Sequence, residues 1–159
     1  MGSFRQSGAY AIEIIVVMLD AMSRYRGATF AYSVASRLGS SKAMNRLGCR
    51  AFEGHRCERN EGLAFQMWKC SAEADHVYGQ ANVGLAYYNG FGTGVDLSAA
   101  LTWYGKAADS GHPESAYNLG LMYADGIGTE RDTRKAILLL TAAAKAGLQE
   151  AEEALKKLQ

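Results

Sequence analysis

A glycine-rich loop is the first stretch of the sequence whose residue types could do chemistry. Residues 90–94 read Gly-Phe-Gly-Thr-Gly, a composition that would suit a loop holding phosphate with its backbone N–H groups. Such a loop needs a strand before it and Lys-Ser/Thr after it, and the sequence offers neither. The same local pattern returns at residues 126–129. We therefore interpret both stretches as connectors between helices.

Cysteine and histidine side chains are the second candidates, since together they could hold a metal ion or form a reactive thiol. Cys49, His55, Cys57 and Cys70 do not have the spacing of known zinc-ligand pairs, and there is no Cys-x-x-Cys. We expect no metal and no cofactor. An enzyme, either a hydrolase or a thiol- or metal-dependent activity centred on the loop of His55 and Cys57, stays open as the alternative function.

Two further histidines, His76 and His112, stand 36 residues apart at equivalent positions before a predicted helix. This recurrence favours a role at the helix entry, capping or exposed, over catalysis. Neither a local Ser/His/Asp arrangement nor a pair of carboxylates in a predicted cleft stands out in the sequence. We expect no catalytic residues and no enzymatic activity.

The elements that would position these residues follow a repeat. Shifting Gly84 onto Gly120, that is by 36 residues, aligns many further identities. They are Leu85/Leu121, Tyr87/Tyr123, Gly90/Gly126, Gly92/Gly128, Thr93/Thr129, Asp96/Asp132, Ala100/Ala136, Ala107/Ala143, Ala108/Ala144 and Gly111/Gly147. A fixed period of this length is the signature of stacked helical repeats.

Each period divides into two helices. In the later copy, apolar residues at helical spacing predict one helix over residues 115–123, which Gly126 ends. Asp132 or Thr133 would cap the second helix, which stops at Gly147, and Asp96 would cap its counterpart. Gly84 and Gly120 fall in helix interiors, where glycine costs about 1 kcal/mol, so we expect close helix packing there.

These residues resemble the Sel-one-like repeat (SLR), a relative of the tetratricopeptide repeat. The matching residues of the later copy are Leu119, Gly120, Tyr123, Gly126, Gly128, Lys135, Ala136, Ala143, Ala144 and Gly147. Those of the earlier copy are Val83, Gly84, Tyr87, Gly90, Gly92, Ala99, Ala100, Ala107, Ala108 and Gly111. Ala99 replaces the usual Lys, and Glu130 stands where the family often has Val. The resemblance implies an all-α fold, a right-handed α-solenoid of antiparallel helix pairs.

We expect one solenoid domain with five parts. They are an atypical N-terminal helical pair (1–43), a degenerate repeat (44–79), two full repeats (80–115 and 116–151) and a C-terminal capping helix (149–159). The predicted helix over residues 9–22 is apolar on nearly all sides, so we expect self-association or continuation of a longer solenoid through it. The capping helix instead has one apolar stripe, Ala151, Ala154, Leu155 and Leu158, beside Glu150, Glu152, Glu153, Lys156 and Lys157, which would face water.

Composition limits the classes of partner. Lys and Arg number 17 against 16 Asp and Glu, so there is no basic excess to hold nucleic acid. No apolar run approaches the roughly 20 residues of a membrane span. Three cysteines cannot all pair with one another, which favours a reducing compartment, the cytoplasm, although the sequence does not establish the location.

The resemblance to tetratricopeptide repeats also implies where a partner would bind. In that family the first helix of each pair lines the concave wall, at fixed distances from the motif glycine. The corresponding residues here are Tyr78, Leu85, Tyr88, Asn89, Glu114, Tyr117, Leu121, Asp125, Asn45 and Phe52. Aromatic residues edged by amides and carboxylates suit a peptide. We predict a non-catalytic adaptor or scaffold that binds a peptide or protein segment on its concave face.

Overall fold

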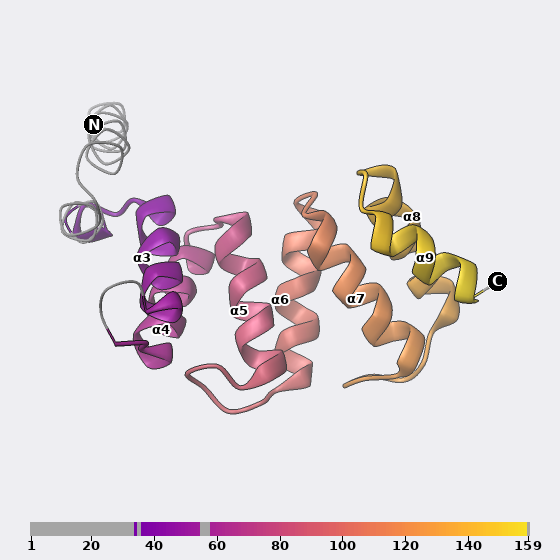
Figure 1. Ribbon diagram of the computed structural model, residues 1–159, viewed down its shortest axis with the longest axis horizontal. Helices are drawn as coiled ribbons and strands as arrows, with labels where there is room; N and C mark the ends of the chain where they lie inside the picture. Colours follow the sequence, from indigo (N-terminus) through magenta and orange to yellow (C-terminus); the bar gives the residue numbers. More distant parts are fainter. Residues whose placement is uncertain (1–33, 35, 55–57, 159) are drawn as a thin grey trace. The chain divides into compact units, whose positions relative to one another are not determined.

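The structure is a computed structural model that describes residues 34, 36–54 and 58–158 (Figure 1). Those residues form seven α-helices and no strand, which confirms the predicted all-α fold. The helices are α3 (Ser41–Glu53), α4 (Glu61–Glu73), α5 (Val77–Asn89), α6 (Leu97–Asp109), α7 (Pro113–Asp125), α8 (Thr133–Lys145) and α9 (Gln149–Leu158). None of these helices is long and apolar enough to cross a membrane. The helix predicted over residues 9–22 and the loop residues His55 and Cys57 lie outside the described residues.

The chain divides into two compact units, residues 1–79 and 80–159. In the first unit, α3 packs against α4 through a small residue. Gly48 is buried, and a Cβ at its position would lie 2.5 Å from Cδ1 of Trp68. The ring of Phe52 also packs on Trp68, with centroids 5.3 Å apart. Ser40 and Asn60 cap the two helices by accepting hydrogen bonds from backbone N–H groups.

The helix-capping residues of the second unit are those that the sequence predicts, and α7 (Pro113–Asp125) extends two residues beyond each end of the predicted 115–123. Asp96 accepts a hydrogen bond from the backbone N–H of Ala99 at 2.9 Å, and Asp132 accepts one from that of Lys135 at 3.0 Å. The hydrogen bond from Lys135 holds the pKa of Asp132 below its usual value. Gly126 ends α7 with a φ of 71°, a left-handed conformation that glycine adopts without a steric cost.

Glycine in the helix interiors brings the paired helices together. A Cβ at Gly84 of α5 would lie 2.7 Å from Cδ1 of Tyr104 on α6, and Tyr104 is only 2% exposed. A Cβ at Gly120 of α7 would lie 2.9 Å from Cγ of Leu140 on α8, which is fully buried. Both contacts are closer than a methyl group allows. The close packing expected at these two glycines is therefore confirmed.

Two clusters of buried side chains lie in the core of the second unit. One surrounds Tyr104 and Met122 and joins α5, α6 and α7. The other surrounds Leu140 and joins α7, α8 and α9, which lie side by side at the C-terminal end of Figure 1. The apolar stripe of α9 belongs to the second cluster: Ala151, Ala154, Leu155 and Leu158. The two clusters therefore fix the positions of α5, α7 and α9 relative to one another within the second unit.

The glycine contacts predict that replacing glycine by alanine has opposite effects on stability at two helix positions. We expect Gly84→Ala to lower the free energy of unfolding by about 1 kcal/mol, because overpacking of Tyr104 outweighs the better helix propensity of alanine. Gly105→Ala is the matched control: Gly105 lies inside α6 with nothing within 4 Å of an added Cβ, and we expect a gain of up to about 1 kcal/mol. Urea unfolding followed by circular dichroism would measure both. Equal stabilisation by the two substitutions would contradict the packing argument.

Candidate functional site

His76 and His112 cap helices. Nδ1 of His112 accepts a hydrogen bond from the backbone N–H of Ser115 at 3.2 Å, and the hydroxyl of Ser115 lies 3.0 Å from the same atom. Nδ1 of His76 accepts from the backbone N–H of Gly79, also at 3.2 Å. The predicted role at the helix entry is confirmed at both positions. Burial lowers the pKa of His112, and nearby Glu114 opposes that effect.

The glycine-rich loop is a connector between α5 and α6, as the sequence predicts. The backbone N–H of Asp96 donates to the carbonyl of Tyr87 at 2.9 Å, and this closes the loop. The matched bond, from Asp132 to Tyr123, is 2.8 Å long. Cys70 is a free thiol. In the described part of the chain, no group of three or more His, Cys, Asp or Glu side chains is placed to hold a metal ion.

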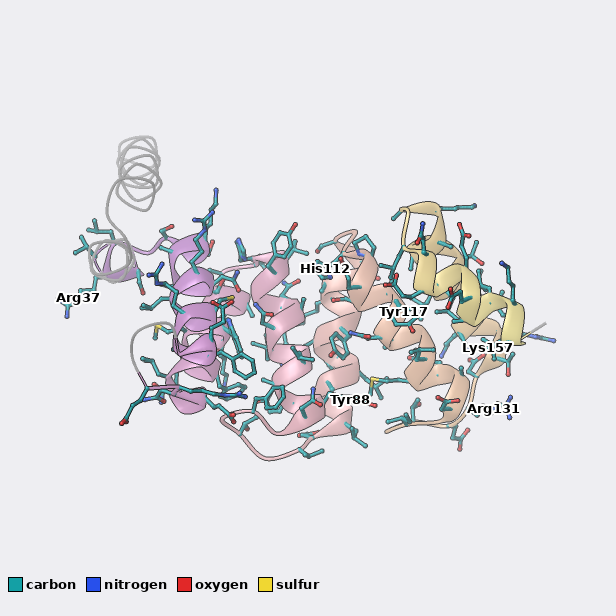
Figure 2. The ribbon with its side chains drawn as sticks, viewed as in Figure 1. Arg37, Tyr88, His112, Tyr117, Arg131 and Lys157 are labelled. Atoms are coloured by element: carbon teal, nitrogen blue, oxygen red, sulfur yellow. The ribbon has the colours of Figure 1, made fainter. Side chains whose placement is uncertain are left out.

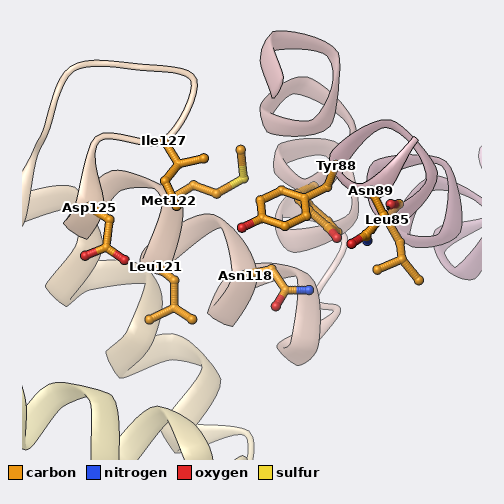
Figure 3. Close-up of a pocket in the computed structure, with 9 residues that line it drawn as sticks. Leu85, Tyr88, Asn89, Asn118, Leu121, Met122, Asp125 and Ile127 are labelled. Carbon is orange, nitrogen blue, oxygen red and sulfur yellow. Dashed lines mark hydrogen bonds between the residues drawn. The ribbon is translucent and has the colours of Figure 1, made fainter. Parts of the chain in front are cut away.

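A pocket of about 330 Å³ opens between α5 and α7. Figure 3 shows the ring of Tyr88, from α5, pointing toward the side chain of Met122, from α7. Tyr88 is 36% exposed, so a ligand could reach its ring. The residues that line the pocket are Leu85, Tyr88, Asn89, Tyr104, Asn118, Leu121, Met122, Asp125 and Ile127.

The base of this pocket is polar but uncharged. Burial raises the pKa of Tyr104, and a hydrogen bond with the side chain of Asn118 only partly offsets this. The phenol of Tyr104 is therefore protonated at neutral pH. At the rim, the side-chain amide of Asn89 donates to the carbonyl of Leu85 at 3.0 Å. A ligand in this pocket would meet mainly apolar walls with two amides to orient it.

A second pocket, of about 390 Å³, opens between α7 and α9. It shares Leu121 and Asp125 with the first pocket, so the two adjoin across the last turns of α7. Figure 2 labels Tyr88, Tyr117 and Lys157, which belong to α5, α7 and α9 in turn. The lining residues are Tyr117, Leu121, Ala124, Asp125, Glu150, Glu153, Ala154, Lys157 and Leu158. We call the two pockets together the groove.

The groove brings together six of the ten predicted site residues: Leu85, Tyr88, Asn89, Tyr117, Leu121 and Asp125. Tyr78 and Glu114 line neither pocket. The side chain of Tyr78 is 60% exposed and its ring lies 5.9 Å from that of His76, while Glu114 lies 3.6 Å from His112. Asn45 and Phe52 are half-buried residues of α3, in the first unit, and the guanidinium of Arg59 lies 4.3 Å from the ring centre of Phe52.

The contribution of α9 to the groove was not predicted, although the sequence contains a signal for it. Moving one more period of 36 residues from Gly120 leads to position 156, where the chain has Lys156 instead of glycine. Counting six and three residues back and one residue forward from position 156 gives Glu150, Glu153 and Lys157, and all three line the second pocket. The helix predicted as a cap therefore also presents groove positions in register with the repeats.

The Sel1 repeat, the family expected from the SLR resemblance, matches residues 41–76, 77–112 and 113–148. The chain belongs to the Sel1 repeat family. Each matched repeat begins three residues before the boundary that we expected from the sequence, because the family's repeat includes the first turn of the first helix. Members of this family generally mediate protein–protein interaction.

Two crystal structures have closely similar folds. One is c5321, a protective antigen present in uropathogenic Escherichia coli strains that displays an SLR fold, with a TM-score of 0.89 and 26% identity over 96% of this chain. The other is a Sel1 repeat protein from Oxalobacter formigenes, with a TM-score of 0.83 and 26% identity over 91% of this chain. The matches span 34% and 57% of those two proteins. The fold is thus the predicted all-α solenoid. No curated protein matches the chain.

The capping role of His112 predicts a pH dependence of stability. The pKa of His112 is lowered below 6.5 in the folded chain, so the unfolded chain binds the proton more readily. The contribution of this cap is then present above pH 6.5 and is lost as the pH falls through the folded-state pKa. We expect the free energy of unfolding to fall between about pH 7 and about pH 5, measured by urea unfolding.

His112→Asn is the matched variant, since asparagine also caps helices but does not titrate in this range. Its stability at neutral pH should stay within about 1 kcal/mol of wild type, and its acid-induced loss should be smaller. The variant retains the other histidines, so the difference between the two pH profiles isolates His112. Identical profiles would show that the cap does not depend on the neutral imidazole.

Proposed function

We propose that this protein is a non-catalytic adaptor that binds a segment of a protein partner in the groove. The observation that carries the proposal is the junction of the two pockets at Leu121 and Asp125. It makes a continuous surface across α5, α7 and α9, longer than a compact small molecule needs and suited to an extended or helical peptide. The family's general role in protein–protein interaction supports the same conclusion.

The side chains in the groove have the chemistry of a peptide-binding surface. Tyr88 presents a rigid aromatic ring at low cost in conformational entropy, beside the apolar walls of Leu85 and Met122. Burying such surface is worth about 25 cal/mol for each Å² removed from water. The oxygen of the Asn89 side chain stays available to accept a hydrogen bond from a bound backbone, since that side chain uses its N–H group on Leu85.

The other four predicted residues, Tyr78, Glu114, Asn45 and Phe52, line neither pocket and stay a separate prediction of partner-binding positions. Tyr78 is well exposed and can contact a ligand without rearrangement. Phe52 would first have to leave its contacts with Trp68 and Arg59, which makes it the weakest of the four. The alternative function, an enzyme centred on His55 and Cys57, concerns residues outside those that the structure describes, and no observation favours it.

Tyr88→Ala tests the groove. We expect this substitution to lower the amount of partner captured from a lysate by the purified chain at least about tenfold, because a central aromatic residue contributes about 2 kcal/mol or more to such interfaces. Leu138→Ala is the control, since Leu138 is a 71% exposed apolar residue of α8 that lines neither pocket. Quantitative mass spectrometry of the captured proteins would compare wild type with both variants.

Circular dichroism should show that both variants keep the helical content of wild type. Tyr117→Ala is less suitable as a first variant, because Tyr117 also packs against the core cluster around Leu140 and its loss would destabilise the fold. If Tyr88→Ala retains every interaction that Leu138→Ala retains, the groove is not the binding site.

A further inference from the structure

The second pocket of the groove has an unequal distribution of charge. Three carboxylates line it, Asp125 at the end of α7 and Glu150 and Glu153 on α9, against one ammonium group, that of Lys157. The whole chain is close to neutral, with a formal net charge of +1. The acidic excess in this pocket is therefore a local feature of the groove and does not follow from the overall composition.

Ion pairing of these carboxylates decides whether they can meet a ligand's charge. Among the residues that the structure describes, Asp125, Glu150 and Glu153 take part in no salt bridge. Lys157 follows Glu153 by four residues, a spacing that permits an ion pair on a helix, but none forms here. All three acidic residues are exposed. Their negative charges can therefore interact directly with a ligand in the pocket.

An apolar surface lies directly beside this charge. Leu121 and Leu158 line the same pocket, together with the ring of Tyr117. The first pocket adds Leu85, Met122 and Ile127, and Asp125 is its only charged residue. Apolar contacts would therefore dominate at α5, and electrostatic contacts would dominate at α9. An occupant of the groove needs both kinds of group in one segment.

We propose that the partner segment is basic and apolar: an apolar side chain such as Leu, Met or Phe fills the first pocket, and Lys or Arg side chains meet Asp125, Glu150 and Glu153 in the second. This inference rests on the proposed function and names the chemistry of its ligand. Complementary charge sets specificity and association rate more than raw affinity, and an acidic segment or a nucleic acid would be repelled from the same pocket.

A peptide selection tests the proposal with defined probes. Random peptides displayed on phage are selected against the purified full chain, and the enriched peptides are then synthesised with a fluorescent label for anisotropy measurements. We expect the enriched peptides to carry Lys or Arg close to Leu, Met or Phe. We also expect their affinity to fall as salt is raised, because exposed charges are screened.

Neutralising the acidic residues of α9 should weaken these peptides selectively. We expect Glu150→Gln/Glu153→Gln to raise the dissociation constant about fivefold or more, since each removes one exposed charge contact. The control is Glu130→Gln/Glu152→Gln, which removes the same total charge from exposed residues that line neither pocket. Glu152 shares the first turn of α9 with Glu150, so the control also matches any effect on the helix end.

The outcomes separate this inference from the proposed function. Peptides that bind Tyr88→Ala more weakly, yet lack basic residues or bind Glu150→Gln/Glu153→Gln unchanged, would overturn the charge preference and leave the groove as the site. Peptides that bind Tyr88→Ala as tightly as wild type would overturn both, as would failure to enrich any peptide. An equal loss of peptide affinity in both double variants would show a general effect of net charge, and it would also overturn the proposed preference of the second pocket for basic side chains.

Discussion

The contact between a glycine in one helix and a large side chain in the next is the constraint on which the rest of the second unit depends. The ring of Tyr104 packs directly on Gly84, and the side chain of Leu140 packs directly on Gly120. At each site glycine makes the helix about 1 kcal/mol less stable than alanine would. In return, the close approach of the helices buries the tyrosine or leucine almost completely. The same arrangement at Gly48 and Trp68 in the first unit shows that the contact survives where the loop motif has degenerated.

This contact also sets the register of the side chains that line the groove. Gly84 and Gly120 face the second helix of their own pair, and the residues one, four and five positions later in α5 and α7 keep a fixed register relative to that contact. They are Leu85, Tyr88, Asn89, Leu121, Ala124 and Asp125, and every one of them lines the groove. The groove is thus a geometric result of the packing of the helix pairs, and its chemistry is free to vary while the packing stays fixed.

The fold could be predicted from the sequence because its determinants are local and repeated. Gly126, Asp96 and Asp132 each act on the turn of helix beside them, so residue type and position suffice to place the helix ends. The groove was predicted only in part. Asn118, Met122 and Ile127 line the first pocket together with residues of α5, and that tertiary proximity is something that periodicity alone does not contain. On α9, Lys156 stands where the repeat would have its motif glycine, so the alignment of this helix with the repeats was not recognised from the sequence.

The helices α3 to α8 are all 13 residues long, and the three matched repeats are all 36 residues long. Because each cap, loop and glycine contact recurs at that interval, a duplicated segment of one period would join the existing helices without leaving a cap or a packing face unmatched. A segment that is not a whole number of periods long would put the caps and packing faces out of register. Such a chain can therefore grow by whole repeats, and each added repeat would bring one new first helix whose exposed positions can be altered independently of its neighbours.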